Sequence, residues 1–258
     1  DAALAAEYQA KRQAQIEEDL KQPFDPDCIL EVRHLRKCFP LKKTFTGKVT
    51  RELVAVDDVS FKLKSGETLG IVGESGCGKT TTGRAILKLH QPTGGQIIFD
   101  GKDITNYKPA QMREIRKQMQ IIFQDPYSSL PPRSTVGGIL SEPVKVHNIV
   151  PKAEVKDYVL ELMDKCGLRD YYYERYPHEF SGGQRQRIGI ARALYKQADI
   201  LFFDEATSSL DSATEQSINR AIEHLSSSNK DLTIVVVAHR ESSLDYCDRI
   251  ITLDKNDK

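Results

Sequence analysis

The feature that most constrains the fold is a glycine-rich octapeptide, GESGCGKT, at residues 73–80. It follows a short apolar run, Thr68 to Val72, and precedes a segment of helical pattern, Thr80 to Leu89. Three glycines let successive backbone N–H groups turn inward toward one anion, and the spacing GxxxxGK[ST] between a strand and a helix is that of a phosphate-binding loop. The sequence therefore predicts a strand–loop–helix unit built to hold phosphate groups.

Side-chain chemistry suggests a role for each part of this loop. Lys79 is suited to reach the β- and γ-phosphates of a nucleotide, and Thr80 offers a hydroxyl to Mg²⁺. The helix N-terminus adds its partial positive charge. Cys77 is interpreted as a small filler between two glycines. The predicted nucleotide contacts are Gly73, Glu74, Ser75, Gly76, Cys77, Gly78, Lys79, Thr80 and Thr81.

The order of apolar and periodic segments predicts an α/β fold, a P-loop core with a mostly parallel sheet and helices on both faces. Val54 to Leu63 alternates like half-buried strands, which predicts an antiparallel β edge near the N-terminus. Residues 134–180 are interpreted as a helical insertion, residues 1–28 as a helical tail or linker, and residues 29–258 as one domain. The other predicted strands are Gln96–Phe99, Met119–Phe123, Ile200–Phe203, Thr233–Val237 and Arg249–Leu253.

Composition narrows the classes of partner. The 258 residues carry a formal net charge of zero, so no nucleic acid is expected as a partner. Five dispersed cysteines form no CxxC pair, which favours a reducing cytosol over a disulfide framework or a zinc site. The longest apolar runs have the length of strands, so any work at a membrane requires docking onto another subunit.

A second chemical signal is the buried-strand pattern Ile200 to Phe203 followed directly by Asp204 and Glu205. Because carboxyl ends of parallel strands meet at one sheet edge, these carboxylates are expected near the phosphate loop. Asp204 is predicted to hold the Mg²⁺ hydration shell and Glu205 to act as general base toward a water. The sequence NKDL at residues 229–232 lacks the final Asp of a guanine-reading motif, which argues against a GTPase.

The class of phosphate-loop protein is indicated by FSGGQRQR at residues 180–187, followed by IGIARAL. This segment resembles the LSGGQ signature of the ABC ATPases. Further family landmarks occur in the same order: Gln124 resembles the Q-loop glutamine, Asp211 the D-loop aspartate and His239 the switch histidine. Phe39 is a weaker match to the aromatic that stacks on adenine. The resemblance covers about residues 29–254.

The resemblance implies that two such domains, identical or different, pack head to tail around ATP and Mg²⁺. The signature residues Ser181, Gly182, Gly183 and Gln184 would then contact the nucleotide held by the partner domain. Gln124 would touch Mg²⁺ and the attacking water, His239 would contact the γ-phosphate, and Asp211 would organise the interface. Transmembrane permease subunits are the further partners implied, which places the chain at the cytoplasmic face of a membrane.

Two parts of the chain resemble different branches of this family. Residues 52–193 are similar to the ATPase subunits of oligopeptide and dipeptide permeases, whereas residues 194–254 look like exporter-type domains, with Ala206 where importers usually have Pro. The interpretation we favour is a subunit that powers peptide import. An exporter-type domain, a non-transport ABC ATPase and a cassette that binds ATP without turnover remain alternatives.

Overall fold

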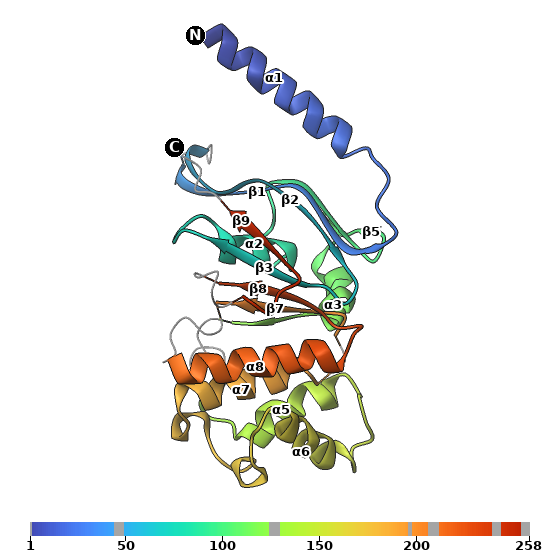
Figure 1. The fold of residues 1–258 in the computed structure, drawn as a ribbon, viewed down its shortest axis with the longest axis vertical. Helices are drawn as coiled ribbons and strands as arrows, with labels where there is room; N and C mark the ends of the chain where they lie inside the picture. Colours follow the sequence, from blue (N-terminus) through green and yellow to red (C-terminus); the bar gives the residue numbers. More distant parts are fainter. Residues whose placement is uncertain are drawn as a thin grey trace. The chain divides into compact units, whose positions relative to one another are not determined.

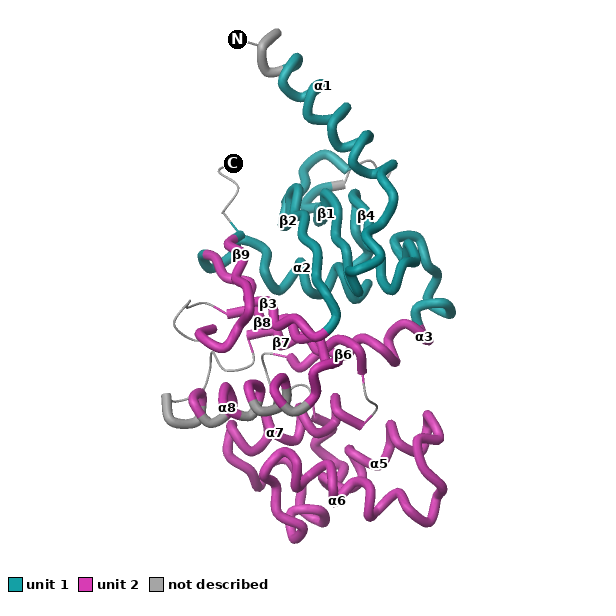
Figure 2. The backbone as a smooth tube through the Cα atoms, turned by 45° about the vertical axis from the view of Figure 1, so that its right-hand side comes forward, with its two compact units in different colours: residues 1–65, 74–112, 253–258 teal, residues 66–73, 113–252 magenta. Residues whose placement is uncertain are grey.

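A computed structural model describes residues 2–43, 49–123, 130–195, 198–205, 212–238 and 244–253. These residues form two compact units, coloured separately in Figure 2. Unit 1 comprises residues 1–65, 74–112 and 253–258, and unit 2 comprises residues 66–73 and 113–252. No helix among the described residues combines the length and the apolar character needed to cross a bilayer.

Unit 1 is built on an antiparallel sheet with strand order β2-β1-β4-β5. Its strands are β1 (Cys28–Lys43), β2 (Val49–Lys64), β4 (Gly94–Phe99) and β5 (Lys102–Asp103). Alternating apolar residues of β1, β2 and β4 point to one side and are buried there, Leu30, Val32, Phe61, Leu63, Ile97 and Phe99 among them. The alternation read from Val54 to Leu63 therefore marks one buried face of this sheet.

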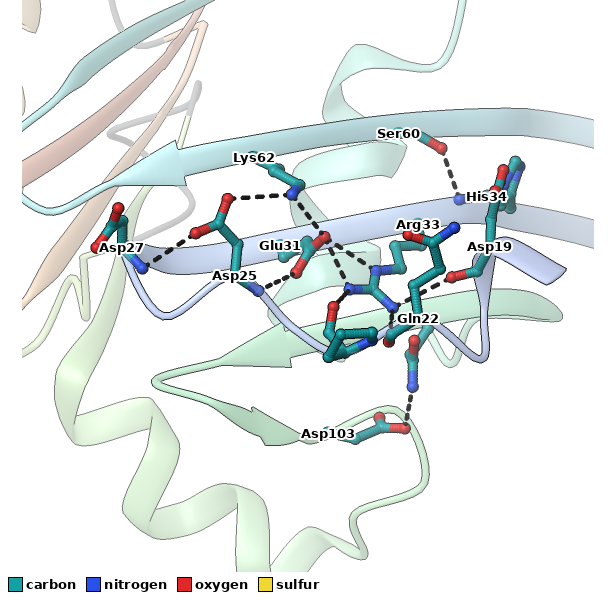
Figure 3. Close-up of polar contacts among 12 residues, drawn as sticks. Asp19, Gln22, Asp25, Asp27, Glu31, Arg33, His34, Ser60, Lys62 and Asp103 are labelled. Carbon is teal, nitrogen blue, oxygen red and sulfur yellow. Dashed lines mark hydrogen bonds and ion pairs between the residues drawn. The ribbon is translucent and has the colours of Figure 1, made fainter. Parts of the chain in front are cut away.

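Helix α1 (Ala2–Asp19) precedes this sheet, and the side chains of residues 6–15 are exposed. The chain that follows α1 is anchored by Arg33 of β1, which is only 8% exposed. Arg33 donates to the carbonyls of Gln22 at 2.7 Å and Pro23 at 2.8 Å. It also pairs with Glu31 at 2.9 Å, and Figure 3 shows Arg33 beside Gln22 and Glu31. A buried guanidinium needs such a complete set of acceptors, so these contacts hold residues 19–23 against β1.

Residues at a β-bulge make a second set of contacts between α1 and the sheet. His34 and Asp58 both have left-handed backbone conformations, with φ of 49° and 62°, where the pairing register of β1 and β2 shifts. The two ring nitrogens of His34 contact Asp58 at 2.5 Å and Asp19 at 3.0 Å. Arg12 of α1 also donates to Asp58 at 2.9 Å. The bulge therefore brings together the polar side chains that hold α1 against β1 and β2.

Unit 2 contains a five-stranded sheet with strand order β6-β7-β8-β3-β9. Its strands are β3 (Thr68–Gly73), β6 (Met119–Ile122), β7 (Ile200–Asp204), β8 (Thr233–Val237) and β9 (Arg249–Leu253). The pairs β6–β7, β7–β8 and β3–β8 are parallel. Every residue of β7 and β8 is buried, as expected for central strands covered on both faces.

Helices of unit 2 share one continuous apolar core with this sheet. They are α5 (Val136–Val146), α6 (Val155–Lys165), α7 (Gly182–Ala193) and α8 (Ser212–Ser228), with short 3₁₀ turns η1 (Asp170–Tyr172) and η2 (Pro177–Glu179). Figure 1 shows α7 and α8 side by side below the strands, and α7 also packs on α5 and α6. The core includes Leu201 and Phe203 of β7, Ile188 of α7 and Ile218 of α8.

The predicted fold class is confirmed, with an antiparallel sheet near the N-terminus and a largely parallel one after it. The clearest differences from prediction concern two helices. Helix α3 (Pro109–Gln118) was not expected, because only Met112 and Ile115 of its residues are buried and apolar. Helix α2 (Lys79–Ile86) ends before the predicted Leu89, since Lys88 adopts a left-handed conformation with φ of 51°.

Candidate functional site

Register within the parallel sheet places two predicted site segments at one edge. Val237 of β8 is the pairing partner both of Ile71 in β3 and of Asp204 in β7. The Glu205 N–H donates to the Val237 carbonyl at 3.1 Å, and the Ala238 N–H donates to the Ile71 carbonyl at 3.0 Å. Asp204 thus lies level with Ile71, and β3 ends two residues later at the start of the phosphate loop. Ligands of such sheets bind beyond these strand ends.

The loop itself has the backbone of an anion cradle. Gly78 stands in the left-handed region with φ of 98°, and a Cβ built on it would lie 2.1 Å from the carbonyl oxygen of Ala55. Only glycine fits at this position, which explains why a glycine directly precedes Lys79. Helix α2 begins at Lys79, directly after Gly78, so the N–H groups of its first turn lie at the end of the loop. These features suit a phosphate group.

Lys79 is held close to the loop that precedes it. Its side chain is 3% exposed, and its Nζ donates to the Glu74 carbonyl at 3.0 Å. The ammonium therefore lies back over the loop rather than extending into solvent. Thr82, three residues on, donates its hydroxyl to the Gly78 carbonyl at 3.0 Å and secures the first turn of α2. The lysine is positioned for an anion seated in the loop.

Asp204 and Glu205 close strand β7 and are 3% and 8% exposed. Glu205 has a left-handed backbone with φ of 49°, a conformation that costs a residue other than glycine about 1–2 kcal/mol. Strain of this kind clusters at functional sites, where surrounding structure holds a side chain in one direction. Buried carboxylates also require cationic or hydrogen-bonding partners. The pair fits a site that handles Mg²⁺ and a reacting water.

The signature segment forms the N-terminus of α7. Ser181 is its N-cap, with the Gln184 N–H donating to Ser181 Oγ at 3.4 Å and the Ser181 N–H donating to Gln184 Oε1 at 3.0 Å. This reciprocal capping box fixes the first turn, which contains Gly182 and Gly183. Arg185 reinforces the turn by donating Nε to the Phe180 carbonyl at 2.8 Å. Ser181 is exposed, Gly182 is half-buried and Gly183 is buried, so the serine is the part of this turn that solvent reaches most.

One contact of this segment could not be expected from the sequence. Gln184 Nε2 also donates to the hydroxyl of Tyr172 at 3.2 Å. Tyr172 lies twelve residues earlier in η1, and no spacing rule links the two positions. The only sequence signal is the aromatic run YYYERY at residues 171–176.

Phe39 lies in β1 of unit 1 and is half-buried. Its ring meets the His90 ring edge-on at a centroid distance of 5.5 Å, and the Lys37 ammonium lies 4.8 Å from its centroid. The ring is thus already engaged by side chains of its own unit. Its predicted stacking on adenine stays a prediction.

Three predicted residues, Gln124, Asp211 and His239, lie outside the described residues. The strands that lead to two of them are described: β6 ends at Ile122 and β8 at Val237. Both run parallel to β7, so both deliver the chain to the edge that carries Asp204. The roles of the three side chains stay predictions.

The predicted site residues include oxygen donors of the kind that bind Mg²⁺. Among the described residues no group of three or more His, Cys, Asp or Glu side chains could hold a metal ion by itself. Mg²⁺ in nucleotide sites is commonly held by one or two protein oxygens together with phosphate oxygens and water. The Thr80 hydroxyl and the Asp204 carboxylate are the predicted donors of this kind that the structure describes.

Comparison with known proteins agrees with these features. Residues 56–208 match the family model described as ABC transporter. The oligopeptide transport ATP-binding protein AppF of Bacillus subtilis is 45% identical over 214 residues, 83% of this chain and 65% of AppF. The glutathione import ATP-binding protein GsiA of Escherichia coli O6:H1 is 48% identical over 208 residues, 81% of this chain and 33% of GsiA.

The chain thus spans 65% and 33% of the lengths of these two relatives. Among solved structures, the dimeric ATP-binding cassette MJ0796 in a post-hydrolysis state bound to ADP and Pi is similar, with a TM-score of 0.77 and 26% identity over 88% of this chain and 96% of that one. The predicted resemblance to importer ATPase subunits is confirmed by the two relatives. The chain belongs to the ABC transporter family.

Proposed function

We propose that this chain binds and hydrolyses MgATP as the motor subunit of an ABC transporter that imports small peptides. Two relatives that share nearly half of its residues over most of its length are named for oligopeptide transport and glutathione import. Glutathione is a tripeptide, so peptides are the cargo class common to both names. The transmembrane subunits would be separate partners, and the chain would work at the cytoplasmic face of the membrane.

The observation that carries the proposal is the shared sheet edge. Strand β3 enters the phosphate loop where β7 presents Asp204 and Glu205, with Val237 pairing to both strands. In this proposal Gly73 to Thr81 bind the phosphates, and Lys79 neutralises their charge. Thr80, Asp204 and Gln124 hold Mg²⁺, which supplies further charge neutralisation when bound.

Hydrolysis requires a water whose proton is removed as its oxygen attacks the γ-phosphorus. We assign this proton to the Glu205 carboxylate, which the strained end of β7 holds in place. The bond from the γ-phosphorus to the bridging oxygen breaks, and ADP and inorganic phosphate leave. His239 is assigned to the γ-phosphate and the water, and Gln124 to the same water. Phe39 is assigned to the adenine.

A second copy or a related domain completes the site in this proposal. The exposed Ser181 caps the N-terminus of α7, and a helix N-terminus suits a γ-phosphate held by the other domain. Gly182, Gly183 and Gln184 belong to this surface, and Asp211 is assigned to the interface. MJ0796, which is similar over most of the chain, is described as a dimer bound to ADP and Pi. ATP would favour the paired state because it contacts both domains only there.

Phosphate release tests the enzymatic part. The purified chain with MgATP should release inorganic phosphate, and Glu205→Gln should slow release about a hundredfold or more while ATP still binds. This substitution isolates the proton transfer, because glutamine keeps the size of glutamate and removes only its basicity. An unchanged rate in the variant, or a wild-type chain that binds ATP without turnover, would contradict the proposal.

The transport part needs a separate experiment. A tagged chain isolated from membranes of its own cells should carry permease subunits that mass spectrometry identifies, and vesicles holding that complex should accumulate a labelled di- or tripeptide only with ATP. Isolation with exporter subunits or with no membrane protein would refute the import assignment and leave the ATPase assignment to the phosphate assay.

A further inference from the structure

We propose that Tyr172 is a positioning residue for the signature segment: its hydroxyl orients the Gln184 amide, and through it the Ser181 turn that meets the nucleotide of the partner domain. This inference rests on the proposed function, because the segment acts in turnover only if it contacts a nucleotide. It adds a residue that lies outside the signature itself and whose sequence position gives no hint of the role.

The Gln184 amide has one acceptor end and one donor end, and each has its own partner. Oε1 accepts from the Ser181 N–H at 3.0 Å, and Nε2 donates to the Tyr172 hydroxyl at 3.2 Å. A flipped amide would set Nε2 against the Ser181 N–H, two donors facing each other. The Ser181 N–H therefore sets the orientation of the amide, and the Tyr172 hydroxyl holds its Nε2 end in place.

The capping box depends on this support because its other half is weak. The Gln184 N–H reaches Ser181 Oγ only at 3.4 Å, near the long limit of a hydrogen bond. The bond from the Ser181 N–H to Oε1 is thus the better of the two. Removal of the Tyr172 hydroxyl, which holds the Gln184 amide at Nε2, should loosen the turn that includes Gly182 and Gly183.

Tyr172 is itself held on several sides, as a positioning residue must be. Its ring meets the buried Phe180 edge-on at 5.0 Å, and its centroid lies 4.6 Å from that of Tyr171. The Arg175 guanidinium lies 5.6 Å from the ring centroid. A hydrogen bond with Tyr171 is the largest cause that raises the pKa of Tyr172.

The test compares two Tyr→Phe changes in the full chain. Tyr172→Phe keeps the ring against Phe180 and removes only the hydroxyl, and it should lower kcat for ATP about three- to tenfold, the range of one hydrogen bond. ATP affinity of the isolated chain should not change, because the phosphate loop is untouched. Tyr176→Phe is the matched control: that ring is 41% exposed and stacks on His178, and its removal of a hydroxyl should leave kcat unchanged.

A double-mutant cycle asks whether the effect passes through Gln184. In a Gln184→Ala background, Tyr172→Phe should have no further effect on kcat. An equal loss in both backgrounds would show that Tyr172 acts by another route and would overturn the inference. So would a wild-type kcat in Tyr172→Phe.

Amide hydrogen exchange of the isolated chain separates this inference from the proposed function. Tyr172→Phe should speed exchange at Ser181 through Gln184, while Tyr176→Phe should not. Unchanged exchange in Tyr172→Phe would refute the positioning role whether or not the chain hydrolyses ATP. Faster exchange together with a wild-type chain that never turns over ATP would instead refute the proposed function, and with it the catalytic consequence assigned to Tyr172.

Discussion

Replacing Gly78 with alanine tests the geometry of the phosphate loop most sharply, because Gly76 provides a matched control two residues earlier. Both glycines have left-handed backbones, with φ of 98° at Gly78 and 82° at Gly76. A Cβ at Gly78 would lie 2.1 Å from the Ala55 carbonyl oxygen, whereas a Cβ at Gly76 would meet nothing within 4 Å. The two variants therefore share the backbone strain and differ in the overlap.

The free energies follow from these two terms. Left-handed strain costs an alanine about 1–2 kcal/mol, and this is the whole effect expected for Gly76→Ala. The overlap in Gly78→Ala requires the loop or β2 to move, which adds about 1–3 kcal/mol. In a chain of this size each kcal/mol lowers Tm by about 2–4 °C, so Gly78→Ala should melt below Gly76→Ala by at least about 2 °C.

Differential scanning calorimetry measures Tm. Isothermal titration calorimetry measures ATP affinity, which depends on the geometry of the phosphate loop. Movement that relieves the overlap also displaces the N–H groups that bind phosphate, so Gly78→Ala should lose ATP affinity as well as stability relative to Gly76→Ala. If Gly78→Ala matched Gly76→Ala in both Tm and ATP affinity, the close approach of Gly78 to Ala55 would be wrong.

Three further predictions address separate parts of the molecule. Lys79→Ala should weaken ATP binding in calorimetry because the buried ammonium over the loop is lost, and wild-type affinity would contradict its role. Ser181→Arg should block phosphate release while the isolated chain keeps its ATP affinity, unless the serine turn has no part in a partner's site. At Asp58, burial raises the pKa, but hydrogen bonds from His34 and Arg12 outweigh it and leave the pKa below its usual range. The stabilisation this gives is present above about pH 4, the unfolded value, and is lost as pH falls through the lower folded value. Asp58→Asn should therefore lower the free energy of unfolding in urea at pH 7, and that free energy should fall less between about pH 4 and pH 2 than in the wild type. A variant as stable as the wild type at pH 7 would refute the stabilising role of the Asp58 contacts.

Local patterns in the sequence were sufficient for the sheet and for the phosphate loop. Strands β7 and β8 are short apolar runs buried on every residue, and such runs predict central parallel strands without knowledge of their neighbours. The loop was predictable because its glycines serve a backbone geometry that few other sequences satisfy. These features depend on residues close together in the chain.

Features set by distant contacts could not be predicted in the same way. Lys88, whose left-handed backbone ends helix α2, donates its ammonium to the carbonyls of Thr105 and Tyr107, both at 2.7 Å. The link between Tyr172 and Gln184 likewise depends on how η1 lies against α7. Neither pair has a characteristic spacing, since tertiary packing alone brings the partners together.

In the candidate site, too, some features could be predicted from the sequence and others could not. Asp204 and Glu205 were placed correctly at the sheet edge that leads into the loop, because parallel topology alone dictates that position. The strain at Glu205, with its left-handed backbone, was not predictable, since glutamate rarely adopts it. The family resemblance, rather than the pattern of the chain, suggested Gln124, Asp211 and His239, and their roles stay predictions.

The central claim is that ATP joins two domains, with its phosphates in the glycine loop of one and against the Ser181 turn of the other. Size-exclusion chromatography with light scattering on Glu205→Gln tests it directly, because slowed hydrolysis preserves the bound state. Addition of MgATP should convert the variant from a monomer of 29.1 kDa to a dimer of twice that mass, and Ser181→Arg in the same background should abolish the shift. A variant that binds MgATP and elutes only as a monomer would contradict the claim.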